Sequence, residues 1–140
     1  MLTTPAIASE PYIAEAPKDV SDVDDLSELE GLDGIICGIP TWNTGADEER
    51  SGTAWDSILE DIGELSLSGK KVAIFGLGDS STYTENYCDA MEELHSYFTK
   101  AGAEMVGYVD KSSYTFDESK SVIGESFCGL PLDEDSESDL

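Results

Sequence analysis

Basic residues are scarce in this chain of 140 residues, which has 7 Lys and Arg against 31 Asp and Glu and a net charge of −24. Nucleic acids and anionic membrane surfaces attract proteins through lysine and arginine, so this deficit argues strongly against both as the main partner. A charge this large fits a protein that is steered towards basic partners, or simply a strongly solvated surface.

Histidine and cysteine are also few. One His and three widely separated cysteines, Cys37, Cys88 and Cys128, with no C-x-x-C pair, argue against a zinc or cysteine-ligated iron site. Cys37 and Cys128 lie in apolar runs and are typical of buried small side chains. The pattern predicts no metal site, no disulfide framework and a reducing compartment.

Long apolar runs are absent. No stretch approaches the length of a membrane span, and residues 1–10 lack the basic start and apolar centre of a secretory signal. Hydrophobic residues still make up 39% of the chain, which is ordinary for a globular protein. We expect an unstructured start at 1–11, one partial domain at 12–135 and an acidic tail at 136–140.

Apolar runs alternate with helical patterns along this domain. We predict strands at 34–39, 71–76, 105–109 and 126–132, with a weaker one at 12–14. Helices are expected as one or two turns within 19–31, as about three turns ending near Gly63, and at 86–101. This order of strands and helices predicts an α/β fold with right-handed crossovers and a parallel sheet.

Two of the predicted strands end in loops that are unusually rich in polar residues, glycine and aromatic rings. The candidate binding residues of these loops are Thr41, Trp42, Asn43, Thr44, Gly45, Gly76, Gly78, Asp79, Tyr83, Asn86, Cys88 and Asp89. The carboxyl ends of parallel strands form the sheet edge where ligands bind. Taken alone, Trp42 is equally consistent with a stacking surface and with a cap on the core. Together with Tyr83 it suits a flat ring held from both faces, without a catalytic base.

These residues carry a resemblance to a known family. Pro40-Thr41-Trp42-Asn43-Thr44-Gly45, then Phe75-Gly76-Leu77-Gly78-Asp79 with Tyr83 and 86–89, resembles the two isoalloxazine-binding loops of flavodoxins. Segment 111–125 is similar to the insertion of the long-chain flavodoxins of algae and cyanobacteria, and 127–133 resembles the strand that resumes after it. The resemblance implies a flavodoxin-like doubly wound sheet of order 2-1-3-4-5. It also implies a low-potential one-electron carrier that binds FMN and is not an enzyme.

The resemblance further implies a role for each loop residue. Trp42 and Tyr83 would stack on the two faces of the FMN ring. The backbone that rearranges beside the flavin nitrogen, where a proton is gained on reduction, would come from Asn43, Thr44 and Gly45. Backbone contacts to the pyrimidine end and ring edge would come from Gly78, Asp79, Asn86, Cys88 and Asp89. Thr41 would lie near the ribityl chain or the phosphate.

The resemblance does not extend over a whole flavodoxin. The family opens with a strand, a Thr/Ser-Gly-rich phosphate loop and a helix, and closes with another helix, and the sequence shows none of these. We therefore expect a truncated flavodoxin with weak FMN affinity, in which one face of the sheet meets water.

The acidic surface bears on partners and on potential. Negative charge around a flavin would lower its potential and steer docking to basic redox proteins, which the resemblance implies are ferredoxin-NADP reductase-like or photosystem-like. The resemblance implies a monomer in the plastid stroma or the cytoplasm. Two other functions stay open: a flavodoxin-like NAD(P)H:quinone reductase, and a flavodoxin-like interaction module without a cofactor.

Overall fold

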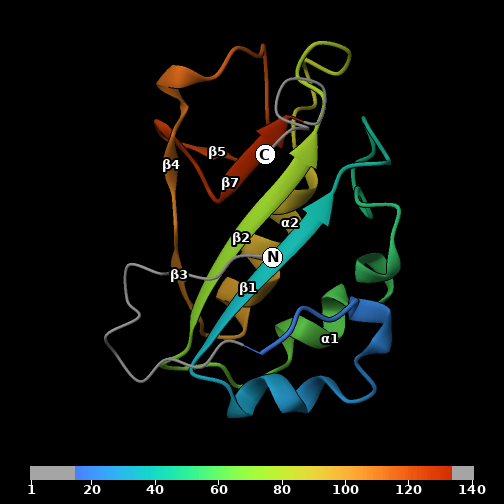
Figure 1. Ribbon diagram of the computed structural model, residues 1–140, viewed down its shortest axis with the longest axis vertical. Helices are drawn as coiled ribbons and strands as arrows, with labels where there is room; N and C mark the ends of the chain where they lie inside the picture. The colour runs from blue at the N-terminus through green and yellow to red at the C-terminus, as the bar shows by residue number, and fades with distance from the viewer. Residues whose placement is uncertain (1–14, 134–140) are drawn as a thin grey trace.

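A parallel sheet runs through the computed structural model, which describes residues 15–133 (Figure 1). β1 (Gly34–Pro40) pairs with β2 (Lys71–Gly78), and β2 pairs along its other edge with β3 (Glu104–Val106) and β7 (Leu130–Asp133). All of these pairings are parallel, and Pro40 lies opposite Leu77. β1 and β2 therefore end at the same edge of the sheet. The predicted α/β fold with a parallel sheet is confirmed.

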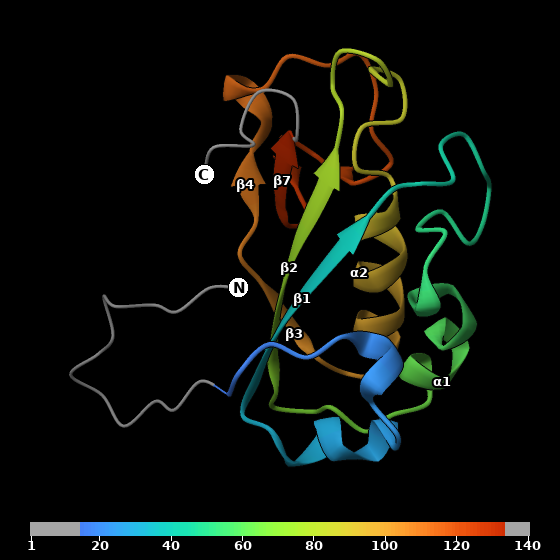
Figure 2. The same ribbon diagram turned by 45° about the vertical axis from the view of Figure 1, so that its right-hand side comes forward.

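Both α-helices of the described region lie on one side of this sheet (Figure 2). α2 (Ala90–Lys100) buries Met91, Leu94 and Phe98 against it, and α1 (Leu59–Gly63) packs beside α2. Side chains along β1 point alternately to the two faces of the sheet, and Cys37 and Ile39 point into the same core. None of the helices within 15–133 has the length and apolar character that a bilayer span requires.

The opposite face of the sheet is less covered. Ile36 of β1 is 51% exposed, and Phe75 of β2 is half-buried with its ring lying over Gly38. A Cβ atom at Gly38 would lie only 2.2 Å from that ring, so any larger residue there would have to displace the Phe75 side chain. Within residues 15–133, no helix covers this face.

Three predicted helical segments differ from the structure. The segment 19–31 forms two 3₁₀ helices, Val20–Asp22 and Leu26–Gly31, because aspartate side chains cap each short turn. The segment expected to be a three-turn helix is a 3₁₀ helix, Ala54–Ser57, followed by the short α1. α2 begins at Ala90 rather than at residue 86, since Cys88 has a φ of 53° and interrupts the helical path.

Two predicted strands are each divided. The expected strand 105–109 becomes β3 and β4 (Val109–Asp110), because Gly107 between them has a φ of 83°. The expected strand 126–132 becomes β6 (Ser126–Phe127) and β7. β6 forms a small antiparallel sheet with β4 and with β5 (Val122–Ile123). The chain then crosses to the main sheet through Gly129, where a Cβ atom would lie 2.4 Å from the Ile74 carbonyl oxygen. The expected strand at 12–14 lies outside the described residues.

The three cysteines are free and buried, as expected for two of them. Burial raises the pKa of the Cys37 thiol to about 12 and that of Cys128 to about 11, and it also raises the pKa of Cys88. We expect all three to react very slowly with a thiol reagent at pH 8 in the folded chain, because the reactive thiolate is disfavoured. The same reagent after unfolding in urea is the control and should label three thiols. Rapid labelling of folded protein would contradict this burial.

Candidate functional site

The two candidate loops meet at the carboxyl edge of the sheet. The first loop (41–53) follows β1, and the second loop (79–89) follows β2 and leads into α2. The Thr41 N–H donates to the Leu77 carbonyl at 3.2 Å, and the Thr41 hydroxyl oxygen accepts from the Ala90 N–H at 3.0 Å. Thr41 thus connects both strand ends to the start of α2. Its predicted place near a ribityl chain or phosphate stays a prediction.

The two aromatic side chains predicted to stack on a ring both face solvent. Trp42 is 68% exposed and Tyr83 is 48% exposed. The alternative in which Trp42 caps the core is therefore wrong. Trp55 is the partly buried tryptophan, and its indole N–H donates to the Gly38 carbonyl at 2.9 Å. Exposed aromatic rings on adjacent loops present apolar area that a flat ligand would cover.

The first loop folds back on itself. The Trp42 N–H donates to the Ser51 carbonyl at 3.2 Å, and the Asn43 N–H donates to the Arg50 carbonyl at 3.0 Å. The Asn43 side chain also donates to the Glu49 carbonyl at 2.8 Å. At the tip, Gly45 has a φ of 84° and no atom near its Cβ position. The side chains of Asn43 and Thr44 are thus used inside the loop, the Thr44 hydroxyl donating to the Thr41 carbonyl at 3.5 Å, while Gly45 is open.

The second loop is ordered by its own turns. The Asp79 carboxylate accepts the N–H groups of Ser81 and Thr82, each at 3.0 Å. The Tyr83 N–H donates to the Asp79 carbonyl, and the Asn86 N–H to the Tyr83 carbonyl, each at 3.0 Å. These contacts fix the turn from which the Tyr83 ring projects.

The glycines of β2 let the end of the second loop approach the sheet. A Cβ atom at Gly76 would lie 2.5 Å from the Met91 side chain, and one at Gly78 would lie 2.9 Å from the Cys88 sulfur. Cys88 is buried, and its carbonyl accepts from the Ser121 hydroxyl at 2.6 Å. The structure therefore places Gly76, Gly78 and Cys88 together, with the thiol turned inwards.

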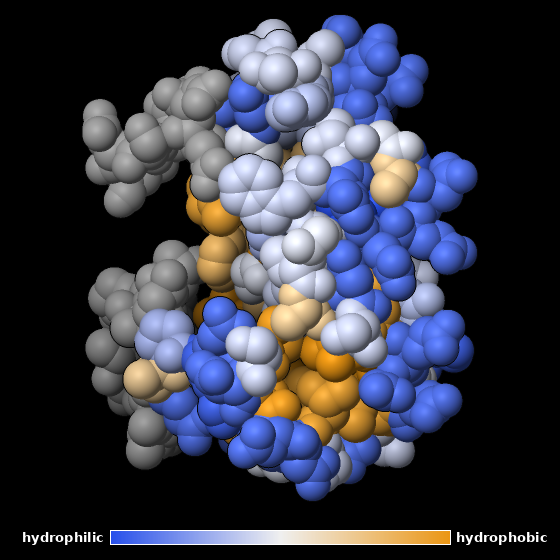
Figure 3. All heavy atoms as spheres, turned by 90° about the vertical axis from the view of Figure 1, so that its right-hand side faces the viewer, coloured by the Kyte–Doolittle hydropathy of each residue, from blue (hydrophilic) through white to orange (hydrophobic). Residues whose placement is uncertain are grey.

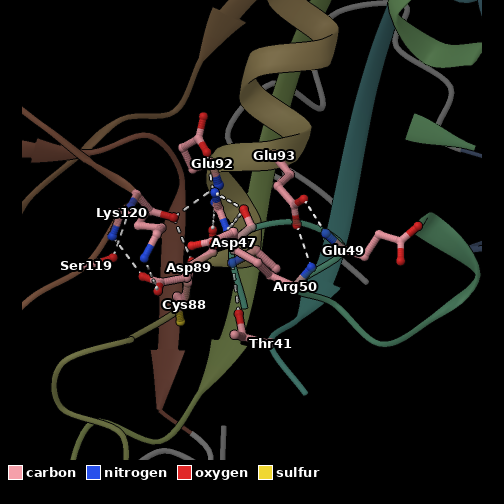
Figure 4. A network of polar contacts seen from close by, with 12 residues as sticks. Thr41, Asp47, Glu49, Arg50, Cys88, Asp89, Glu92, Glu93, Ser119 and Lys120 are labelled. Carbon is pink, nitrogen blue, oxygen red and sulfur yellow. Dashed lines mark hydrogen bonds and ion pairs between the residues drawn. The ribbon is translucent and has the colours of Figure 1, made fainter. Parts of the chain in front are cut away.

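The Asp89 side chain is engaged inside the protein. Its carboxylate accepts the Lys120 N–H at 2.8 Å and lies 3.7 Å from the Lys120 ammonium (Figure 4). This contact joins the end of the second loop to the segment 111–125. The Asp89 carboxylate is buried and so is not directed at a ligand. Any contribution to a flavin would come from its backbone, as the resemblance implies.

Sequence reasoning missed the residues that hold the first loop in place. Arg50 is buried, and its guanidinium donates to Glu92 at 2.8 Å and to the Asp47 carbonyl at 2.9 Å. Glu93 is also buried and accepts the N–H groups of Glu49 and Arg50 (Figure 4). The sequence held one sign of this role, which is that Arg50 is its only arginine.

The surface around the first loop is hydrophilic. Figure 3 shows the face that carries this loop and α1, with polar side chains over its upper part and outer rim and an apolar area lower down. Asp47, Glu48 and Glu49 are exposed on the first loop, and Glu85 is exposed on the second. Both loops that carry the exposed aromatic side chains thus bear negative charge.

Comparisons with known proteins agree with this geometry. The flavodoxin family model matches residues 10–139. The chain belongs to the flavodoxin family. It is 40% identical over 122 residues to a flavodoxin of Synechococcus elongatus, covering 87% of this chain and 69% of that one. It is 36% identical over 129 residues to flavodoxin 1 of Salmonella typhimurium, covering 88% of this chain and 71% of that one. The predicted family is confirmed.

A solved structure shares the fold. The flavodoxin of Fusobacterium nucleatum, solved with flavin mononucleotide bound, matches with a TM-score of 0.72 and 29% identity, covering 81% of this chain and 65% of that one. The chain thus spans about two thirds of the length of its flavodoxin relatives.

Proposed function

We propose that this chain is an FMN-binding, low-potential one-electron carrier. The observation that carries the proposal is the pair of exposed aromatic side chains, Trp42 and Tyr83, on adjacent loops at one edge of the parallel sheet. Membership of the flavodoxin family supports it, as does the flavin mononucleotide bound by the related Fusobacterium nucleatum protein.

The residues at this edge fit the ring end of FMN. Trp42 and Tyr83 would cover the two faces of the ring and exclude water from it. The backbone of Asn43, Thr44 and Gly45 would lie beside the flavin nitrogen that exchanges a proton. At Gly45 nothing lies within 4 Å of the Cβ position, so this backbone has room to turn a peptide group towards that nitrogen.

The second loop would contribute its backbone. Its contacts to the pyrimidine end and ring edge would come from Gly78, Asp79, Asn86, Cys88 and Asp89. The buried side chains of Cys88 and Asp89 leave only their main-chain groups for this role. When bound, FMN supplies the ring that accepts and returns single electrons, and the protein supplies its position and electrostatic surroundings.

The acidic residues at the site set the potential and the choice of partner. Glu49, Glu85 and their neighbours place negative charge around the ring site, which opposes an added electron and lowers the potential. The same charges attract basic redox proteins, in the manner expected for ferredoxin-NADP reductase-like or photosystem-like partners. Transfer would take place at the ring edge, without a catalytic residue.

The alternatives have less support. Within residues 15–133, no side-chain arrangement described above favours a nicotinamide site, which a quinone reductase requires. An interaction module without a cofactor would leave Trp42 and Tyr83 exposed with no ligand, and exposed apolar groups of this size are a liability.

Reconstitution of the full chain with FMN tests the proposal. We expect saturable quenching of flavin fluorescence with FMN in excess, and two separate one-electron steps on stepwise reduction. The second step should lie at low potential because of the surrounding negative charge. An unchanged flavin spectrum and fluorescence at saturating FMN would contradict the proposal, and catalysed oxidation of NAD(P)H by a quinone would favour the reductase instead.

A further inference from the structure

We propose that Glu93, on α2, is a positioning residue for Trp42. Its buried carboxylate binds the returning part of the first loop, and that part in turn holds the backbone of the residue predicted to stack on the flavin. The inference rests on the proposed function for its consequence in flavin binding, while the contacts themselves belong to the chain alone.

The first step is the contact between Glu93 and the loop. One carboxylate oxygen accepts the Glu49 N–H and the other accepts the Arg50 N–H, both at 2.7 Å. Glu49 has a φ of 55°, a left-handed conformation that is uncommon outside glycine. Successive N–H groups in such a turn form a concave anion-binding nest, and here Glu93 is the anion. Hydrogen bonds to an ionised carboxylate are stronger than those between neutral groups, so this contact stabilises the left-handed turn at Glu49.

The second step is the Arg50 side chain, which joins the same turn to the same helix. Its guanidinium donates to the Glu92 carboxylate at 2.8 Å and to the Asp89 carbonyl at 3.2 Å (Figure 4). Arg50 is 8% exposed, so these bonds are little screened by solvent. Its charge also offsets the negative charges of Glu92 and Glu93 that the turn faces.

The third step is the set of contacts that joins residues 50–52 to Trp42. The carbonyls of Arg50 and Ser51 accept the N–H groups of Asn43 and Trp42, at 3.0 and 3.2 Å. At Gly52, a Cβ atom would lie 3.0 Å from the Trp42 Cβ, so the two sides of the loop are in close contact. Moving residues 49–52 away from α2 would therefore move Trp42.

This anchoring bears on where Trp42 lies relative to Tyr83. The second loop, which carries Tyr83, continues directly into α2, and Glu93 fixes the first loop to that same helix. α2 thus anchors the first loop, while the turn at Asp79 holds Tyr83 on the second. Holding Trp42 in place before a ligand arrives lowers the cost of ordering it on binding.

The test is Glu93→Gln in the full chain. Glutamine keeps the size of the side chain but offers an amide donor where the second N–H needs an acceptor. We expect the amides of Glu49, Arg50, Trp42 and Asn43 to exchange with deuterium about tenfold faster or more, measured by NMR without flavin. The control, Glu60→Gln, removes the same charge from an exposed position on α1 and should leave these rates unchanged.

Flavin binding gives the second readout. Glu93 acts on the part of the site that would hold the ring, which FMN and riboflavin share. Glu93→Gln should therefore weaken the binding of both flavins by the same factor, about tenfold, equivalent to ~1.4 kcal/mol. Unchanged exchange at Trp42 and Asn43 would overturn the inference, and so would faster exchange with unaltered affinity in a chain that binds flavin. Failure of the unaltered chain to bind any flavin would instead overturn the proposed function. If Glu93→Gln does not fold, Glu93→Asp, too short to reach both amides, replaces it with the same expected outcomes.

Discussion

Replacing Trp42 with alanine is expected to weaken FMN binding about 100-fold and to leave the chain equally stable. Covering a large side chain contributes ~1.5–3 kcal/mol and aromatic stacking ~0.5–1.5 kcal/mol. Because Trp42 is already partly covered, we take the lower part of the sum, ~2.7 kcal/mol, which corresponds to about a hundredfold in affinity. Since Trp42 is 68% exposed without a ligand, its loss removes little packing from the folded chain. The free energy of unfolding should change by less than about 0.5 kcal/mol. Fluorescence titration with FMN and urea unfolding measure the two quantities.

Two further variants make this result specific. Tyr83→Ala should also weaken binding, by a smaller factor, because Tyr83 is the more covered of the two before a ligand arrives. Tyr108→Ala is the matched control, since Tyr108 is an exposed aromatic residue outside both loops and should leave FMN affinity unchanged. Equal affinities in the Trp42→Ala variant and the unaltered chain would show that Trp42 does not contact the ring.

The sequence was sufficient to predict the framework of the site because its signals are local. An apolar run that reaches Pro40 predicts a strand that finishes there or lies on an edge of the sheet, and β1 does end at Pro40. The run before Gly76 likewise predicts β2, which extends two residues further, to Gly78. Two neighbouring parallel strands bring Trp42 and Tyr83 to one edge, whatever the details of the loops.

The features that the sequence did not predict depend on contacts between residues far apart in the chain or on local backbone conformation. Arg50 and Glu93 are 43 residues apart, and nothing near either one indicates that they meet. The division of the last predicted strand depends on the close approach of Gly129 to Ile74, which an apolar run does not reveal. The path at Cys88 depends on its positive φ, a conformation that a cysteine rarely adopts.

Replacing Phe127 with alanine should have the largest effect on stability, a loss of about 3–5 kcal/mol in the free energy of unfolding. Phe127 is fully buried in β6, with the rings of Phe116 and Tyr114 at 5.0 and 5.1 Å and that of Tyr87 at 6.0 Å. The vacated space is bounded by three rings from two segments, the second loop and 111–125, which cannot all close on it. Such a loss is large against the ~5–15 kcal/mol typical of a domain.

The comparison of Phe127→Ala with Phe127→Leu separates loss of volume from loss of the ring, and leucine should cost less than half as much. Urea unfolding followed by circular dichroism measures both, and a loss below about 1 kcal/mol for alanine would contradict the packing described. Tyr87 immediately precedes Cys88 in the second loop, so loosening this cluster should also weaken FMN binding. Phe127→Ala is therefore expected to lower stability and affinity together, whereas Trp42→Ala lowers affinity alone. That difference distinguishes a residue that builds the site from one that contacts the ligand.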